Sequence, residues 1–237
     1  MLKITNVSKS YDKVKKAINE INLEICPGDI YGFIGHNGAG KTTLLKSIAG
    51  ILSFDSGEIT IFDKSIVKDN LEAKKIMAYI PDNPDIYEML SGIQYLDFIA
   101  DAYGVDLEKR RNLINKYAKM FEMDLVLNNP INSYSHGMKQ KIVIMSALIH
   151  SPKVMLLDEP FVGLDPKASY LLKEVFHELV AQGSLIFFST HVLEVAEKLC
   201  NKVAIIKNGK IVANGLTEEI VKDNSLENIF LELLNES

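Results

Sequence analysis

The sequence predicts an α/β fold: a mostly parallel sheet core, a small antiparallel β subdomain near the N-terminus and an inserted all-helical segment. Three observations support this prediction. Patterns of half-buried strands cluster before residue 63, and only helical periodicity is found between about residues 86 and 149. After residue 152, apolar strands alternate with amphipathic helices. Such alternation favours a mostly parallel sheet with helices on both of its faces.

The N-terminal strands are indicated by alternating apolar and polar side chains. Residues 2–8 and 18–25 show this pattern, and residues 58–62 show it again. Three strands so close together in the sequence predict a small antiparallel sheet. Tyr11 falls in the loop between the first two strands, where its ring can stack on a nucleotide base or can be an ordinary loop tyrosine.

The remaining elements are inferred from hydrophobic spacing. Breakers at 130–133 interrupt the helical insertion, and its last helix is expected over residues 135–150. An earlier helix of the insertion presents one predicted apolar face, made of Tyr95, Phe98, Ile99 and Ala102. Beyond residue 152 the predicted strands and helices, in chain order, are 154–157, 171–180, 185–188, 192–199, 203–206 and 210–213.

The most specific stretch of the chain is a glycine-rich segment that follows the apolar residues 30–34. It matches the pattern G-x-x-x-x-G-K-[ST] without a mismatch, and the helical spacing of Leu44 and Ile48 follows it. A loop between a strand and a helix lets backbone N–H groups converge on a phosphate, while Lys41 adds a positive charge and Thr42 a hydroxyl for Mg²⁺. This context disfavours the alternative, a glycine-rich turn with an exposed lysine. The segment consists of Gly35, His36, Asn37, Gly38, Ala39, Gly40, Lys41, Thr42 and Thr43.

A second element of a phosphate site follows the apolar strand 154–157. Asp158 ends this strand, and a parallel sheet carries it to the same edge as Lys41, where it can hold Mg²⁺ through water. Glu159 points in a different direction and can orient or deprotonate an attacking water. The alternative is that both acids only cap the strand. His191 ends another apolar strand, where it can hydrogen-bond a γ-phosphate or be structural.

Composition excludes several classes of protein. The 237 residues are 47% hydrophobic, enough for a sizeable core, and the formal net charge of −5 argues against a general nucleic-acid surface. The two cysteines, without a C-x-x-C, suggest a reducing compartment and no metal cluster. The N-terminus lacks the apolar core of a signal peptide, and the longest apolar run, 142–149, is too short to span a membrane. We therefore expect a protein that is soluble by itself in a reducing compartment, such as the cytoplasm, and for which any membrane role requires a partner.

With these elements in this order, the sequence resembles the ATP-binding cassette (ABC) family, and specifically the ATPase subunits of ABC transporters. The resemblance covers about residues 2 to 215. It implies a P-loop NTPase core of the RecA-like type within a single ABC ATPase domain. The expected parts of this domain, 1–237, are the core and β subdomain, 1–85 and 151–215, a helical subdomain, 86–150, and a C-terminal helical tail, 216–237.

The resemblance assigns family roles to the phosphate-site residues. It implies that segment 35–43 is the Walker A motif and that segment 154–159 is the Walker B motif with a catalytic Glu159. His191 is similar to the family's switch histidine. Tyr11 falls at the family's adenine-stacking aromatic position, which favours the stacking role over an ordinary loop tyrosine.

Two further segments resemble parts of the family's dimer interface. Asp165 lies in a Gly-Leu-Asp-Pro segment similar to the D-loop, and Ser135 and Gly137 fall in the signature motif, which contacts the γ-phosphate bound by the other subunit. The signature departs from the family pattern because its first glycine is His136 and its glutamine is Met138. The Ser135 hydroxyl and the N–H groups at the helix N-terminus can still bind a phosphate.

Asp82 is the other departure from the family pattern. It stands where the family usually has a glutamine that joins Mg²⁺ to the helical insertion. An acid can still accept a hydrogen bond from a Mg²⁺-bound water, although its side chain is shorter by one methylene group. We expect altered coupling rather than lost hydrolysis.

The resemblance implies an ATP-hydrolysing subunit that uses ATP and Mg²⁺. Two copies, or one copy and a related cassette, would close around two ATP molecules and drive a separate integral membrane permease from the inner face of the cell membrane. Segments 81–88 and 135–141 resemble those of bacterial exporters, which favours export. The alternatives are a soluble ABC ATPase acting on ribosomes or DNA, and a nucleotide switch without turnover. The acidic composition predicts no nucleic-acid partner.

Overall fold

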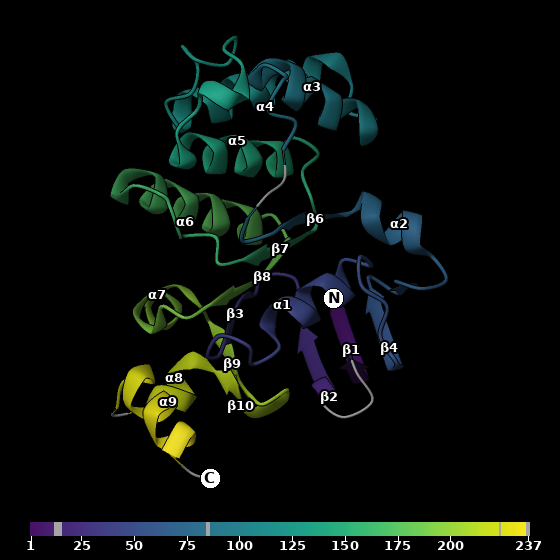
Figure 1. The fold of residues 1–237 in the computed structure, drawn as a ribbon, viewed down its shortest axis with the longest axis vertical. Helices are drawn as coiled ribbons and strands as arrows, with labels where there is room; N and C mark the ends of the chain where they lie inside the picture. Colours follow the sequence, from purple (N-terminus) through teal and green to yellow (C-terminus); the bar gives the residue numbers. More distant parts are fainter. Residues whose placement is uncertain (12–15, 84–85, 223, 236–237) are drawn as a thin grey trace.

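The fold has two sheets, a helical layer at one end and a pair of C-terminal helices at the other (Figure 1). The expected boundary of the helical insertion and part of the exporter-like segment 81–88 fall at residues 84–85, which lie outside the described residues. The structure, a computed structural model, describes residues 1–11, 16–83, 86–222 and 224–235.

The smaller sheet is antiparallel and has the strand order β2-β1-β4-β5. Along β1, Leu2, Ile4 and Val7 are buried while the residues between them are exposed, so only one face of the sheet packs on the protein. This result confirms the antiparallel sheet that the alternating pattern predicts. Its strands are β1 (Leu2–Ser10), β2 (Lys16–Ile25), β4 (Ser56–Ile61) and β5 (Lys64–Ser65).

The larger sheet has six strands in the order β10-β9-β3-β8-β7-β6. Five of them are parallel, and the edge strand β10 is antiparallel to β9. Every residue of β3, β7 and β8 is buried, as expected for parallel strands covered on both faces. The strands are β3 (Ile30–Ile34), β6 (Met77–Ile80), β7 (Val154–Asp158), β8 (Leu185–Thr190), β9 (Lys202–Lys207) and β10 (Lys210–Leu216).

Four of the described helices, α3 to α6, begin at polar residues whose side chains cap them. Ser91 and Gln94 form a reciprocal capping box at the start of α3, and Asp106, Ser135 and Asp165 each cap the N-terminus of a helix. The described helices are α1 (Lys41–Ile48), α2 (Asn70–Lys75), α3 (Gly92–Ala102), α4 (Leu107–Met120), the 3-10 turn η1 (Ile131–Ser133), α5 (His136–Leu148), α6 (Pro166–Ala181), α7 (Leu193–Leu199), α8 (Thr217–Val221) and α9 (Leu226–Asn235).

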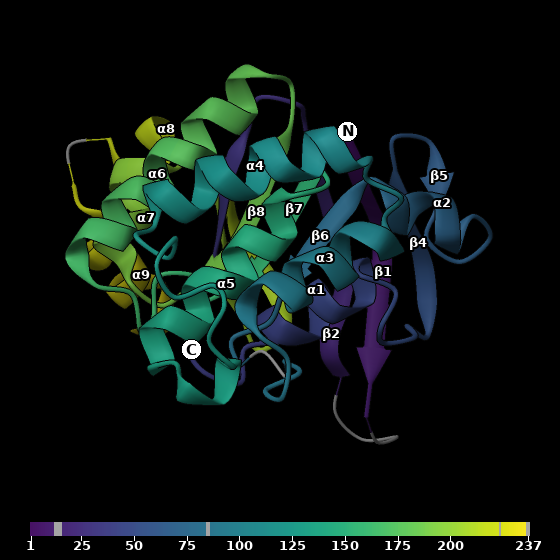
Figure 2. The ribbon, with the colours of Figure 1, turned by 90° about the horizontal axis from the view of Figure 1, so that it is seen from above.

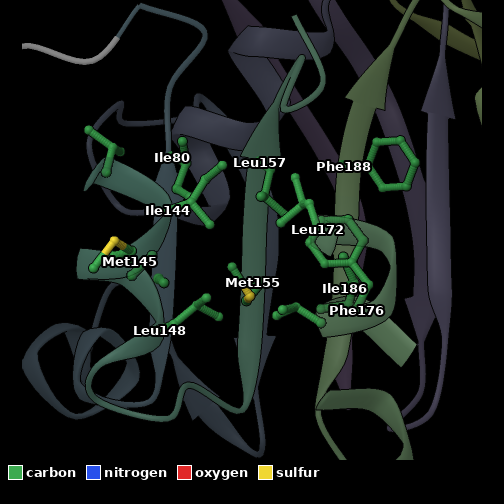
Figure 3. Close-up of a cluster of buried hydrophobic side chains, with 14 of the residues drawn as sticks. Ile80, Ile144, Met145, Leu148, Met155, Leu157, Leu172, Phe176, Ile186 and Phe188 are labelled. Atoms are coloured by element: carbon green, nitrogen blue, oxygen red, sulfur yellow. The ribbon is translucent and has the colours of Figure 1, made fainter. Parts of the chain in front are cut away.

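Alternate residues of the central strands belong to two hydrophobic cores, one on each face of the sheet. Met155 and Leu157 of β7 point between α5 and α6 (Figure 3). Their neighbours Val154 and Leu156 belong to the opposite core, which includes residues of α1 and the antiparallel sheet. Figure 2 shows β1, β4 and β5 to one side of helices α3 to α5. Each fully buried aliphatic side chain contributes about 1.5–3 kcal/mol, so the doubly covered strands contribute strongly to the stability of the fold.

Two helical faces differ from the sequence-based expectation. Helix α3 buries Tyr95, Leu96 and Ala100, whereas Phe98, expected on the buried face, is 47% exposed. This helix carries apolar residues on more than one side, and its packing against α5 selects which of them are buried. Helix α7 starts at Leu193 rather than at residue 192, the expected start, so Val192 is its exposed N-cap.

His150 joins the end of α5 to the central sheet. Its ring stacks on Tyr103 with 3.7 Å between the ring centroids, and its Nε2 lies 3.2 Å from the Met77 carbonyl oxygen of β6. The other ring nitrogen, Nδ1, is buried and has no hydrogen-bond partner among the described residues. Burial lowers the pKa of His150 to about 4, against a smaller opposing effect of the hydrogen bond to Met77.

The folded protein is expected to lose stability as pH falls through the window between 6.5 and about 4. In that window His150 is protonated in the unfolded chain but stays neutral in the folded chain. The stability that the folded state gains from a neutral His150 is therefore fully present above pH 6.5 and decreases below it. The full effect is about 3 kcal/mol, from the energy of one pKa unit. Thermal or urea unfolding of the wild type and His150→Phe, measured from pH 7 to 4.5, should show a shallower decline for the variant. Equal slopes would contradict this role of His150.

Candidate functional site

A cavity of about 530 Å³ lies at the carboxyl ends of β3 and β7. Parallel strands bring their carboxyl ends to the same edge, and ligands of such sheets bind there. Most of the residues predicted for nucleotide and Mg²⁺ binding line this cavity, while Gly35 and Ala39 are buried. The lining residues are Tyr11, Ala17, His36, Asn37, Gly38, Gly40, Lys41, Thr42, Thr43, Asp82, Asp158 and Glu159.

The glycine-rich loop needs a glycine where it enters α1. Gly40 has a φ of 114°, and a Cβ there would lie 2.4 Å from the Ala17 carbonyl oxygen and 2.9 Å from Ile18 Cγ2. A side chain is therefore excluded at this position by both the backbone angle and the neighbouring strand. No described side chain caps α1, so the N–H groups of its first turn remain available to an anion.

Lys41 reaches back across this loop. Its Nζ donates to the Gly35 carbonyl oxygen at 2.7 Å and lies 3.6 Å from Glu159 Oε1. The side chain is 7% exposed. The ammonium group is thus held at the cavity by partners that phosphate oxygens can replace.

Asp158 is the best-connected acid of the site and is buried. Thr42 Oγ1 donates to its Oδ2 at 2.6 Å, and Ser189 Oγ donates to its Oδ1. Ser189 is a site residue that no sequence motif indicates, because only the pairing of Asp158 with Ser189 between β7 and β8 brings the two together. The one available signal is a hydroxyl at the end of an apolar strand, just before His191 in the sequence.

The donor set fits Mg²⁺. Thr42 and Asp158 present two oxygens within hydrogen-bond distance of each other, and Asp82 lines the same cavity. Mg²⁺ binds through one or two protein oxygens together with waters and substrate phosphates, so this sparse set is suitable. Among the described residues, no group of three or more His, Cys, Asp or Glu could hold a metal by itself.

Glu159 has an unusual backbone conformation. Its φ is 51°, and its N–H donates to the Ser189 carbonyl oxygen at 3.2 Å. A left-handed non-glycine residue costs roughly 1–2 kcal/mol, which the surrounding contacts must offset. This backbone turn places the carboxylate between Lys41 Nζ and His191 Nδ1, the latter 3.0 Å from Oε2. His191 therefore lies against Glu159, with its side chain 54% exposed.

Tyr11 is placed at the rim of the cavity. Its side chain is exposed, and its hydroxyl lies 3.2 Å from Thr43 Oγ1. Its ring is accessible to a planar group that occupies the cavity.

Besides the buried Gly35 and Ala39, four predicted site residues do not line this cavity: His191, which lies against Glu159, and Ser135, Gly137 and Asp165. Ser135 Oγ accepts from the Met138 N–H at the start of α5, where Gly137 also lies, and Asp165 caps α6. The chain therefore brings together the Walker A and Walker B residues but keeps the signature and D-loop residues outside their cavity.

Known proteins resemble this chain in sequence and in fold. The family model described as "ABC transporter" matches residues 18–162. EcsA of Bacillus subtilis (strain 168), an ABC-type transporter ATP-binding protein, is 33% identical over 100% of this chain and 97% of its own length. A solved structure of an ATP-binding subunit of an ABC transporter superposes with a TM-score of 0.95 at 31% identity, covering 99% of this chain and 100% of the other.

A dimeric ATP-binding cassette in a post-hydrolysis state, bound to ADP and Pi, shares the fold, with a TM-score of 0.82 at 24% identity over 92% of this chain and 99% of its own. The fold and site define an ABC ATPase cassette. The chain belongs to the ABC transporter family as an ATP-binding subunit, which confirms the fold class and the family that the sequence resembles. None of the helices in the described ranges has the length and hydrophobicity needed to cross a membrane.

Lys41→Ala is expected to raise the Kd for ATP by at least about 10-fold, because it removes charge-assisted hydrogen bonds worth about 1.5–3 kcal/mol. Binding of a fluorescent ATP analogue, followed by titration, measures this effect. Lys46→Ala, at the other end of α1, is the matched control and should bind like the wild type. An unchanged affinity in Lys41→Ala would exclude the lysine from the phosphate site.

Proposed function

We propose that the chain hydrolyses ATP in a closed pair of cassettes, either two copies of itself or one copy and a related cassette. The proposal is supported by the separation of the site residues. Ser135 and Gly137 lie outside this chain's own cavity, at a helix N-terminus suited to a phosphate. A second copy can present these residues to the γ-phosphate, so each site is complete only in the pair.

The observation that carries the chemistry is the Glu159 carboxylate at the mouth of the glycine-rich loop, between Lys41 and His191. A bound triphosphate competes for Lys41 and leaves Glu159 free to accept a proton. Water then loses a proton to Glu159 as its oxygen bonds to the γ-phosphorus. The bond from the γ-phosphorus to the bridging oxygen breaks, which leaves ADP and inorganic phosphate.

The surrounding residues position this reaction. Lys41 and the α1 amides hold the phosphates, and His191 orients Glu159 through its Nδ1 contact. Thr42 and Asp158 would hold Mg²⁺, with Asp82 accepting from its water shell. When bound, the ion supplies positive charge to the phosphate oxygens. Tyr11 stacks on the adenine at the rim.

A separate membrane permease is the proposed partner, contacted through the helical insertion at the inner face of the cell membrane. The support is a group of exposed apolar side chains that follow Asp82 in the chain: Tyr87 is 60% exposed, Met89 85% and Phe98 47%. The Tyr87 and Phe98 rings contact each other edge to face, with centroids 5.4 Å apart. Exposed apolar groups of this kind mark protein–protein surfaces. The direction proposed is export, which rests on the resemblance of segments 81–88 and 135–141 to exporter subunits.

Glu159→Gln tests the pair and the chemistry together. The amide cannot accept the proton, so turnover should fall by about 100-fold or more, while ATP binding persists. Size-exclusion chromatography with light scattering should then show an ATP-dependent dimer. Glu174→Gln, at an exposed position of α6, is the control and should hydrolyse ATP normally. Wild-type turnover in Glu159→Gln would remove the carboxylate from the mechanism.

Met89→Asp tests the membrane partner. A charge in an apolar contact should reduce co-purification with a membrane protein from detergent-solubilised cells by at least about 10-fold. ATP hydrolysis by the isolated variant should not change. Leu125→Asp is the control, because Leu125 is 90% exposed in the same helical region but lies outside the segment that follows Asp82. Equal loss in both variants would contradict a contact at Met89.

A further inference from the structure

The signature segment and the D-loop contact each other within one chain, at the position where the signature departs from its family. His136 is the first residue of α5, and Gly163 has a φ of 81°. A Cβ built on Gly163 would lie 2.6 Å from both Cδ2 and Nε2 of the His136 ring. The imidazole therefore occupies the space that a side chain at residue 163 would need.

Two more contacts join the same two segments. A Cβ built on Gly137 would lie 3.1 Å from the Gly163 carbonyl oxygen, so the helix start and the loop are closely packed. Lys141 Nζ, one turn further along α5, lies 2.9 Å from Asp165 Oδ2. The hydrogen bond from the Ala168 N–H, and then the bond to Lys141, keep the pKa of Asp165 below its usual value. The Asp165 carboxylate thus caps α6 and also forms an ion pair with Lys141 of α5.

The same loop leads directly to the candidate catalytic acid. Gly163 lies four residues after Glu159, and the Val162 N–H donates to the Glu159 carbonyl oxygen at 3.1 Å. Glu159 itself has a left-handed backbone, and its own N–H donates to the Ser189 carbonyl oxygen. A displacement of Gly163 therefore changes the backbone turn that aims the Glu159 carboxylate.

We propose that His136 is a positioning residue. Its ring, seated on Gly163, fixes the loop 159–165 against the start of α5, so that Ser135 and Glu159 move as one unit. This inference rests on the proposed function, in which Ser135 contacts the nucleotide bound by the second copy. Glu159, in contrast, acts on the nucleotide bound by its own chain. The contact makes hydrolysis at one nucleotide sensitive to how Ser135 engages the other.

A double-mutant cycle tests the contact. His136→Ala removes the ring, and Gly163→Ala displaces it. Each change should lower kcat for ATP hydrolysis by roughly 10- to 100-fold, the effect of a misplaced catalytic group, and should leave the Kd of the monomer for ATP within about 2-fold of the wild-type value. In the double variant the methyl group introduced at position 163 takes the place of the ring edge. If the two changes acted independently, their fold losses in kcat would multiply. We expect the kcat of the double variant to be at least about 3-fold higher than that product predicts.

A third variant separates packing from polar chemistry. His136→Phe keeps a planar ring on Gly163 but has no ring nitrogen, so it should regain most of the kcat lost in His136→Ala. This arm does not depend on the folding of Gly163→Ala. Gly183→Ala is the matched backbone control, because Gly183 has a φ of 88° with no atom within 4 Å of a built Cβ. Its effect on the thermal midpoint measures the cost of alanine at positive φ alone.

The outcomes are distinguishable from failure of the proposed function. If Glu159→Gln forms no dimer with ATP, the pair of cassettes is wrong, and this inference is wrong with it. If the dimer forms but the two single effects on kcat simply multiply, only the role of His136 is overturned. The same holds if His136→Phe is as impaired as His136→Ala, since the imidazole nitrogens would then matter rather than the packing.

Discussion

The buried carboxylate of Asp158 is the interaction on which the rest of the site depends. It accepts from Thr42 at the start of α1 and from Ser189 at the end of β8, so a single side chain joins three segments that are distant in sequence. Burial of a carboxylate is costly unless its oxygens are hydrogen-bonded. The two hydroxyls meet this requirement in the described structure, and they hold the phosphate loop at the edge of the sheet where Glu159 emerges.

The covered sheet makes this arrangement rigid. Strands β3, β7 and β8 are buried throughout, and their side chains alternate between two separate cores. A shift of one strand by one residue would exchange the side chains of both cores, so the register is strongly specified. Register in turn aligns Asp158 with Ser189 and Ile34 with Thr190. The stable part of the molecule thus positions the loops that carry the chemistry.

The loops themselves are held by backbone conformations that are uncommon for residues with side chains. Gly40 and Gly163 adopt positive φ values where neighbouring atoms leave no room for a side chain, and Glu159 adopts one although it has a side chain. The departure of the signature from its family pattern has a structural counterpart here. His136 fills the space above Gly163, and the signature start and the D-loop are packed as one surface.

Local sequence patterns were enough to predict the fold class and the family, both of which are confirmed, and they also predict the phosphate-binding segment. The periodicity of strands and helices, the spacing of glycines and the acids at strand ends are local patterns. Each of them involves residues that are close together in the sequence, so each can be recognised without the structure. The short helices α2 and α8 lack such a period and cannot be predicted from it, and the exposed side of α3 cannot be chosen from an apolar pattern that covers several faces. Only tertiary structure decided that Ser189 supports Asp158, that His191 lies on Glu159, and that His136 packs on Gly163. These contacts join residues from different strands and helices. The strand pattern can place two residues at the same edge of a sheet, but sequence spacing does not say which side chains meet there.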